Sequence, residues 1–93
     1  MPKYLIERII PDAGKLSQGD LEAISRKSND VLEQMKREGK NIQWIQSYVS
    51  DAAIQCVYIA SDQETVREHA RRGGFPADKI SEVRGVIDPT TGE

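Results

Sequence analysis

Two side chains in this sequence could act as metal ligands or reactive groups: the only histidine, His69, and the only cysteine, Cys56. A neutral imidazole is the commonest metal ligand in proteins. A thiolate is a soft metal ligand and also a nucleophile. His69 and Cys56 are therefore the candidate metal ligands of the chain. The alternative for each is structural: a packed histidine with one nitrogen hydrogen-bonded to a backbone carbonyl, and a small buried hydrophobe in a strand.

A second group of candidates combines aromatic rings with polar tips, as in an interface or the floor of a ligand pocket. These residues are Trp44, Gln46, Tyr48 and Tyr58. Strict alternation along two neighbouring strands places them, together with Cys56, on the open face of a sheet. It places Ile45, Val49, Val57 and Ile59 on the other face, beneath helices. A slip of one residue in the register would exchange the two faces.

The segment Ser61 to Pro76 predicts a helix that carries His69. Ser61 and Glu64 have the spacing of a capping box, Gly73 and Gly74 provide a left-handed C-cap, and Phe75-Pro76 ends the helix. Within the helix an apolar stripe has the spacing i, i+3, i+4 and i+7, and it consists of Val66, His69, Ala70 and Gly73. The imidazole is therefore expected to face inward.

The remaining segments complete an alternation of strands and helices. Strands are predicted at Tyr4–Ile10, Ile42–Val49, Ile54–Ile59 and Ile80–Ile87, and a long helix runs from the Ser17 cap, with Asp20 three residues on, to Gly39. The two middle strands form a hairpin around residues 50–52. The order β-α-β-β-α-β predicts an α+β, ferredoxin-like sandwich, in which a four-stranded antiparallel sheet carries both helices on one face. We interpret residues 1–93 as a single domain with a polar tail at 88–93.

Composition narrows the classes of function. The formal net charge is −2 and neither sign forms a long block, so we expect neither nucleic acid nor a membrane as a partner. The apolar runs are short and no signal-peptide pattern is present, which predicts a cytoplasmic protein. A single cysteine allows no intrachain disulfide. At this chain length a partner subunit often completes the core, so we expect a homodimer.

Several segments resemble a known family. MPKYLIER, IQWIQSYVSD, CVYIASDQETVREHARRGGFPADKISEV and VIDPTTGE are similar to small, nickel-binding, ferredoxin-like bacterial proteins. The most specific parts are the string E-H-A-x-x-x-G-F-P, Glu68–Pro76, and the strand pattern W-x-x-S-Y-V, Trp44–Val49. The resemblance implies a homodimer that binds nickel at the dimer surface and takes part in nickel sequestration or detoxification. His69 and Cys56 lie in matching segments and are carried over as its candidate ligands.

We therefore expect a small metal-binding protein, with nickel as the candidate ion, rather than an enzyme. One alternative is a dimeric α/β-barrel-like enzyme or small-molecule binder with a pocket on the open sheet face. Another is an interaction module that exposes Trp44 and Tyr48. A deep pocket that contains Cys56 or His69 with a neighbouring Glu or Tyr would favour the enzyme over metal storage, whereas a sheet face filled by a partner would count against it.

Overall fold

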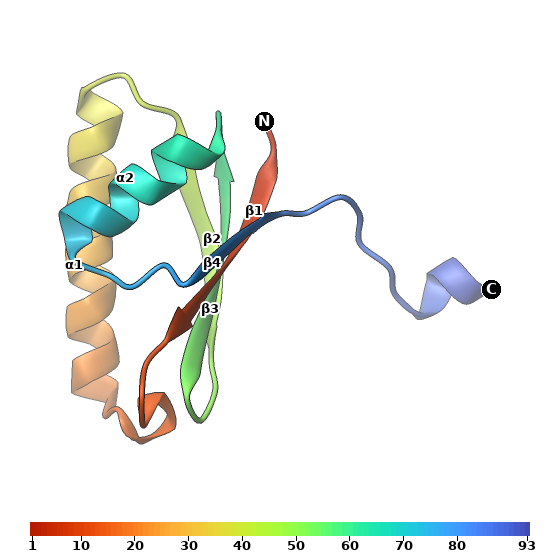
Figure 1. Ribbon diagram of the computed structural model, residues 1–93, viewed down its shortest axis with the longest axis horizontal. Helices are drawn as coiled ribbons and strands as arrows, with labels where there is room; N and C mark the ends of the chain where they lie inside the picture. The colour runs from red at the N-terminus through yellow and green to blue at the C-terminus, as the bar shows by residue number, and fades with distance from the viewer.

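The computed structural model describes residues 1–93 and has four strands in one antiparallel sheet, with both α-helices on one side of it (Figure 1). The elements are β1 (Lys3–Ile9), a 3-10 turn (Ala13–Lys15), α1 (Gln18–Arg37), β2 (Ile42–Val49), β3 (Ala53–Ala60), α2 (Gln63–Gly73), β4 (Lys79–Glu82) and a terminal 3-10 turn (Pro89–Gly92). The strand order across the sheet is β2-β3-β1-β4. The predicted ferredoxin-like fold is confirmed.

The first helix begins as its sequence predicts. Ser17 Oγ accepts a hydrogen bond from the Asp20 backbone N–H at 3.1 Å, and Asp20 Oδ2 accepts one from the Ser17 N–H at 3.0 Å. This reciprocal pair satisfies two backbone donors that the first turn leaves free. The helix ends at Arg37, and Gly39 follows with a φ of 83°, a conformation that glycine adopts without strain. All buried residues of α1 lie in its second half: Ser28, Val31 and Met35.

The cap predicted for the second helix is wrong by one residue. Asp62 Oδ1, rather than the Ser61 hydroxyl, accepts the hydrogen bond from the Thr65 N–H, at 2.8 Å. A carboxylate is a stronger acceptor than a hydroxyl at the positive end of a helix. The C-cap at Gly74 (φ 69°) agrees with the prediction. The inward stripe is also confirmed, because the buried residues of α2 are those named above.

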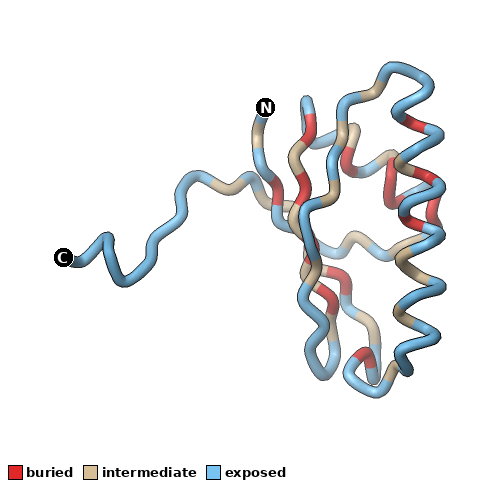
Figure 2. The backbone as a smooth tube through the Cα atoms, turned by 180° about the vertical axis from the view of Figure 1, so that it is seen from behind, coloured by how far each residue is buried: buried red, intermediate tan, exposed pale blue.

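The fourth strand is shorter than the predicted Ile80–Ile87. β4 pairs with β1 from Lys79↔Glu7 to Tyr4↔Glu82, and the last bond runs from the Val83 N–H to the Lys3 carbonyl. β1 begins at Lys3 and offers no partner beyond it, so the pairing stops there. From Arg84 onward the chain leaves the body of the molecule and every residue is exposed (Figures 1 and 2).

The predicted faces of the hairpin are wrong for β3, for Trp44 and for Ile45, which was expected beneath the helices but is exposed. The helix side of β3 carries its buried residues, which are Ile54, Cys56, Tyr58 and Ala60, while Val57 and Ile59 lie on the open side. Trp44 pairs with Tyr58 but Gln46 pairs with Val57, so Ile45 is the extra residue of a β-bulge. The bulge places Trp44 and Gln46 on opposite faces although they are two residues apart. Simple alternation cannot reveal such an insertion.

The core lies between the helices and the sheet, where the buried positions gather (Figure 2). It contains Tyr4, Ile6, Ala13, Ile54, Cys56, Tyr58, Ala60 and Val66. Neither helix has the length and apolar character that crossing a membrane would require.

Candidate functional site

A buried arginine lines a cavity between α1 and the sheet. Arg8 is only 4% exposed and projects from β1 toward the helices. Its Nε donates to Cys56 Sγ at 3.4 Å, Nη2 to the Tyr58 hydroxyl at 3.3 Å, and Nη1 to the Pro76 carbonyl at 2.6 Å. None of the ion pairs in the structure includes Arg8. No carboxylate of the chain therefore pairs with its positive charge.

Phe75 forms one wall beside this guanidinium. The Arg8 Cζ lies 5.4 Å from the centroid of the Phe75 ring, within the range of a cation–π contact. The ring packs against the end of α2 at Gly73, where a Cβ atom would overlap the ring. The residues expected only to end the helix thus also shape the site.

The cavity lies between the first half of α1 and the sheet and has a volume of about 200 Å³. Nine of its 13 lining residues are hydrophobic, among them Leu21, Ile24, Trp44 and Val49. The other four lining residues are Arg8 and three serines, and Cys56 and Tyr58, which belong to the nine, add a thiol and a hydroxyl. The result is an apolar cavity with one buried cation, a common composition for a small-ligand site.

The structure divides the predicted pocket residues between the two faces. Trp44, Tyr58 and Cys56 line the cavity on the helix side. Gln46 and Tyr48 are exposed on the open face, where the Gln46 amide donates to the Tyr48 hydroxyl. The cavity therefore lies on the side of the sheet opposite to the one predicted.

His69 is fully buried beside the cavity. Its Nε2 lies 3.2 Å from Ser28 Oγ, its Nδ1 has no partner, and its ring centroid is 5.2 Å from that of Tyr58 and 5.7 Å from that of Phe75. Burial, and then the positive charge of Arg8, lower the pKa of His69 to about 4, so the imidazole is neutral at pH 7. Its hydrogen-bond partner is a side-chain hydroxyl and not the backbone carbonyl that the structural alternative named.

The surroundings of His69 and Cys56 do not fit a nickel ion within one chain. No group of three or more His, Cys, Asp or Glu side chains lies close enough together to hold a metal ion. Cys56 Sγ faces the Arg8 guanidinium, a cation that would repel Ni²⁺. The assignment of these two residues as metal ligands stays a prediction, without support from their geometry.

Arg8 and Phe75 were not among the site residues predicted from sequence. In β1 one face carries two charged residues, Lys3 and Glu7, and the other carries only Arg8, so alternation favours the face of Arg8 as the buried one but gives the guanidinium no role. The only sequence signal for Arg8 is its alternation with Tyr4 and Ile6 in a strand at the centre of the sheet.

A search of curated proteins found no match. Among solved structures, the protein SCO4226 from Streptomyces coelicolor A3(2) is similar, with a TM-score of 0.74 and 17% identity over 91% of this chain and 99% of that chain. At this identity the likeness establishes the shared fold. The sequence model of the family described as nickel responsive protein SCO4226-like matches residues 4–83. This chain therefore belongs to the nickel responsive protein SCO4226-like family.

Proposed function

We propose that this chain is a nickel-binding protein, that it works as a homodimer, and that the dimer forms through the open face of the sheet. The observation that carries the choice of metal is the match to a nickel-responsive family over residues 4–83. The structure adds two constraints, one on the surface available to a partner and one on the side chains available to the metal.

The open face supports the dimer because apolar side chains lie there without cover. Leu5 and Ile9 of β1 are 40% and 50% exposed, and Tyr48 of β2 is 55% exposed. Leu5 pairs across the strands with Val57, so these side chains adjoin one another on a single surface. Contiguous exposed apolar surface of this kind is typical of an interaction site. A second copy of the chain would bury it.

The C-terminal arm, residues 83–93, is a second reason to expect a partner copy. It extends away from the body of the molecule (Figure 1), and its apolar residues Val86 and Ile87 are 74% and 84% exposed. Two adjacent aliphatic side chains on an extended segment would gain free energy by packing against another subunit.

The buried state of His69 limits how nickel could bind. His69 is 0% exposed, so neither copy in a dimer could offer an imidazole at the shared surface. The ligands would then be oxygen atoms. Glu7 is the only acidic strand residue on the open face, and none of the ion pairs in the structure includes it. A two-fold dimer brings the same surface of both copies together, which places two Glu7 carboxylates in one interface. Burying two carboxylates is costly unless positive charge compensates them. Lys79 is the cross-strand neighbour of Glu7, and Ni²⁺ would supply further positive charge between the two copies.

The test measures thermal unfolding of the untagged protein with and without Ni²⁺, together with its mass in solution. We expect a dimer whose melting temperature rises with nickel, because a ligand that binds only the folded state stabilises it by mass action. Glu7→Gln should abolish the rise. Glu22→Gln, which removes a matching charge from the exposed side of α1, should retain it.

His69→Ala separates the two sets of possible ligands. We expect its nickel-dependent rise to match that of the wild type, because the imidazole is buried. If Ni²⁺, Co²⁺ and Zn²⁺ all leave the wild-type melting curve unchanged, nickel binding is wrong. If His69→Ala loses the rise while Glu7→Gln keeps it, nickel binds but Glu7 is not its ligand.

A further inference from the structure

We propose that the cavity between α1 and the sheet binds a small organic acid, and that Arg8 holds its carboxylate while the apolar walls hold its body. This site lies on the covered face of the sheet, opposite to the face proposed for nickel and dimer formation. The two proposals can therefore be tested independently of each other.

Arg8 has N–H donors that no protein group accepts. A guanidinium has five N–H donors, and three of them are used by Cys56, Tyr58 and Pro76. Two N–H groups remain without a protein acceptor. A carboxylate can accept two N–H groups of one guanidinium at once, which is among the strongest hydrogen-bonding arrangements in proteins.

Arg8 also lacks a carboxylate partner. Taking a guanidinium out of water is costly unless an anion compensates its charge. Arg72, by contrast, has two carboxylate partners, Glu38 and Glu68. Tyr58 cannot supply a negative charge to Arg8 near pH 7, because burial raises the pKa of its hydroxyl. An anionic ligand would provide the charge that the protein does not.

The walls of the cavity are largely apolar and enclose a small volume. Leu21 and Ile24 of α1 face Trp44 and Ile54 of the sheet across the cavity, and Phe75 lies at the side. The volume of about 200 Å³ lies below the range of about 300 to 1,000 Å³ that is typical of pockets for drug-sized ligands. The walls and volume together indicate a short aliphatic acid or an acid with one aromatic ring, rather than inorganic phosphate.

Trp44 makes the proposal directly measurable. It is the only tryptophan in the chain and it lines the cavity, so its fluorescence reports on occupancy. The probes are hexanoate and phenylacetate, each compared with its neutral amide, and inorganic phosphate. We expect saturable changes with the acids and binding of the amides weaker by about tenfold or more, because the amides cannot pair with the charge of Arg8. Phosphate should bind weakly, because it leaves the apolar walls unfilled.

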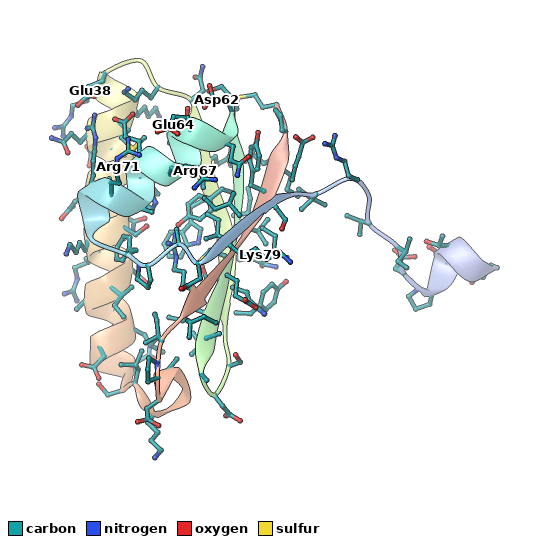
Figure 3. All side chains as sticks on the ribbon, in the orientation of Figure 1. Glu38, Asp62, Glu64, Arg67, Arg71 and Lys79 are labelled. Carbon is teal, nitrogen blue, oxygen red and sulfur yellow. The ribbon has the colours of Figure 1, made fainter.

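Two variants assign the binding to Arg8. Arg8→Met keeps the length of the side chain and removes its charge, and it should eliminate the preference for acid over amide. Arg67→Met is the matched control, because Arg67 is exposed on α2 (Figure 3) and has no ion-pair partner in the structure; it should bind acids as the wild type does. Arg8→Lys should bind acids more weakly than the wild type, because an ammonium lacks the planar fork.

The outcomes are decisive even if a variant fails to fold, because the comparison of acids with amides uses the wild-type protein alone. The proposal is overturned if the acids give no saturable change, if the amides bind as tightly as the acids, or if Arg8→Met keeps the preference for acids. A preference for phosphate over both acids would also overturn it.

Discussion

The two halves of the space between the helices and the sheet differ sharply. Beneath α2 and the second half of α1 the packing is dry, and Met35, Val66 and His69 are each 0% exposed. Beneath the first half of α1 lies the cavity, where Leu21 and Ile24 are only half-buried. α2 lies alongside the second half of α1 and not beside the first (Figure 1). A close-packed interior forms where two helices and the sheet meet, and a single helix leaves a space.

The two buried nitrogen-containing side chains, His69 and Arg8, lie one in each half of this space. Tyr58 contacts both of them: its hydroxyl accepts a hydrogen bond from Arg8, and its ring packs against that of His69. On the dry side the group is an imidazole, which can lose its charge and remain neutral. On the cavity side the group is a guanidinium, which stays charged at any ordinary pH. A permanent charge is tolerable only where water or an anion can reach it, so the contrast favours the cavity as the half that binds a ligand.

Two truncations on the same helix should show the largest effect. Met35→Ala removes a side chain that is 0% exposed and should lower the free energy of unfolding by about 2 to 5 kcal/mol. Ile24→Ala removes a half-buried side chain at the edge of an existing cavity and should cost about 1 kcal/mol, partly offset by the helix propensity of alanine. Urea unfolding at pH 7 measures both. Equal losses would mean that the two halves are packed alike.

The free energy of unfolding should fall at acid pH, because protonation of the buried His69 is unfavourable in the folded protein. The pKa of His69 is about 4 in the folded protein against an ordinary value of 6.5. The unfolded chain therefore binds more protons between these values, and stability falls as the pH drops from about 6.5 to about 4. A pKa difference of about 2.5 corresponds to a loss of about 3 kcal/mol.

Urea unfolding of the wild type and His69→Gln at pH 7, 6 and 5 tests this dependence. The wild type should lose stability steeply over this range, and the variant should lose much less, since the carboxylates are the same in both proteins. The pKa values of two of them, Glu38 and Glu68, are lowered by arginine and lysine partners, chiefly Arg72 for Glu38 and Lys40 for Glu68. Parallel curves for the two proteins would exclude His69 as the cause.

Some features of this comparison follow from sequence and others do not. The inward stripe of α2 and the Ser17 cap are local patterns, because the residues involved lie within one or two turns of each other. The faces of the hairpin depend on the bulge at Ile45, and the length of β4 depends on where β1 begins. The buried environment of Arg8 joins it to Pro76, 68 residues away. Contacts of that kind are set by the assembled fold. Alternation grouped Trp44, Cys56 and Tyr58 on one face of the sheet, and the structure brings these three residues together at the cavity, but on the opposite face.

The smallest effect concerns the start of α2, the helix that closes the dry half. Asp62, at the N-terminal end of α2 (Figure 3), caps the helix through the Thr65 N–H, and Ser61 contacts only the Thr65 hydroxyl. Asp62→Ala should therefore lower the free energy of unfolding by about 1 kcal/mol, and Ser61→Ala by less. Hydrogen exchange should accelerate in the first turn of α2 in Asp62→Ala, while acid binding measured by Trp44 fluorescence stays unchanged, because no residue of α2 lines the cavity. A larger loss in Ser61→Ala would restore the capping box predicted from sequence, and weaker acid binding in Asp62→Ala would show that the two halves are coupled.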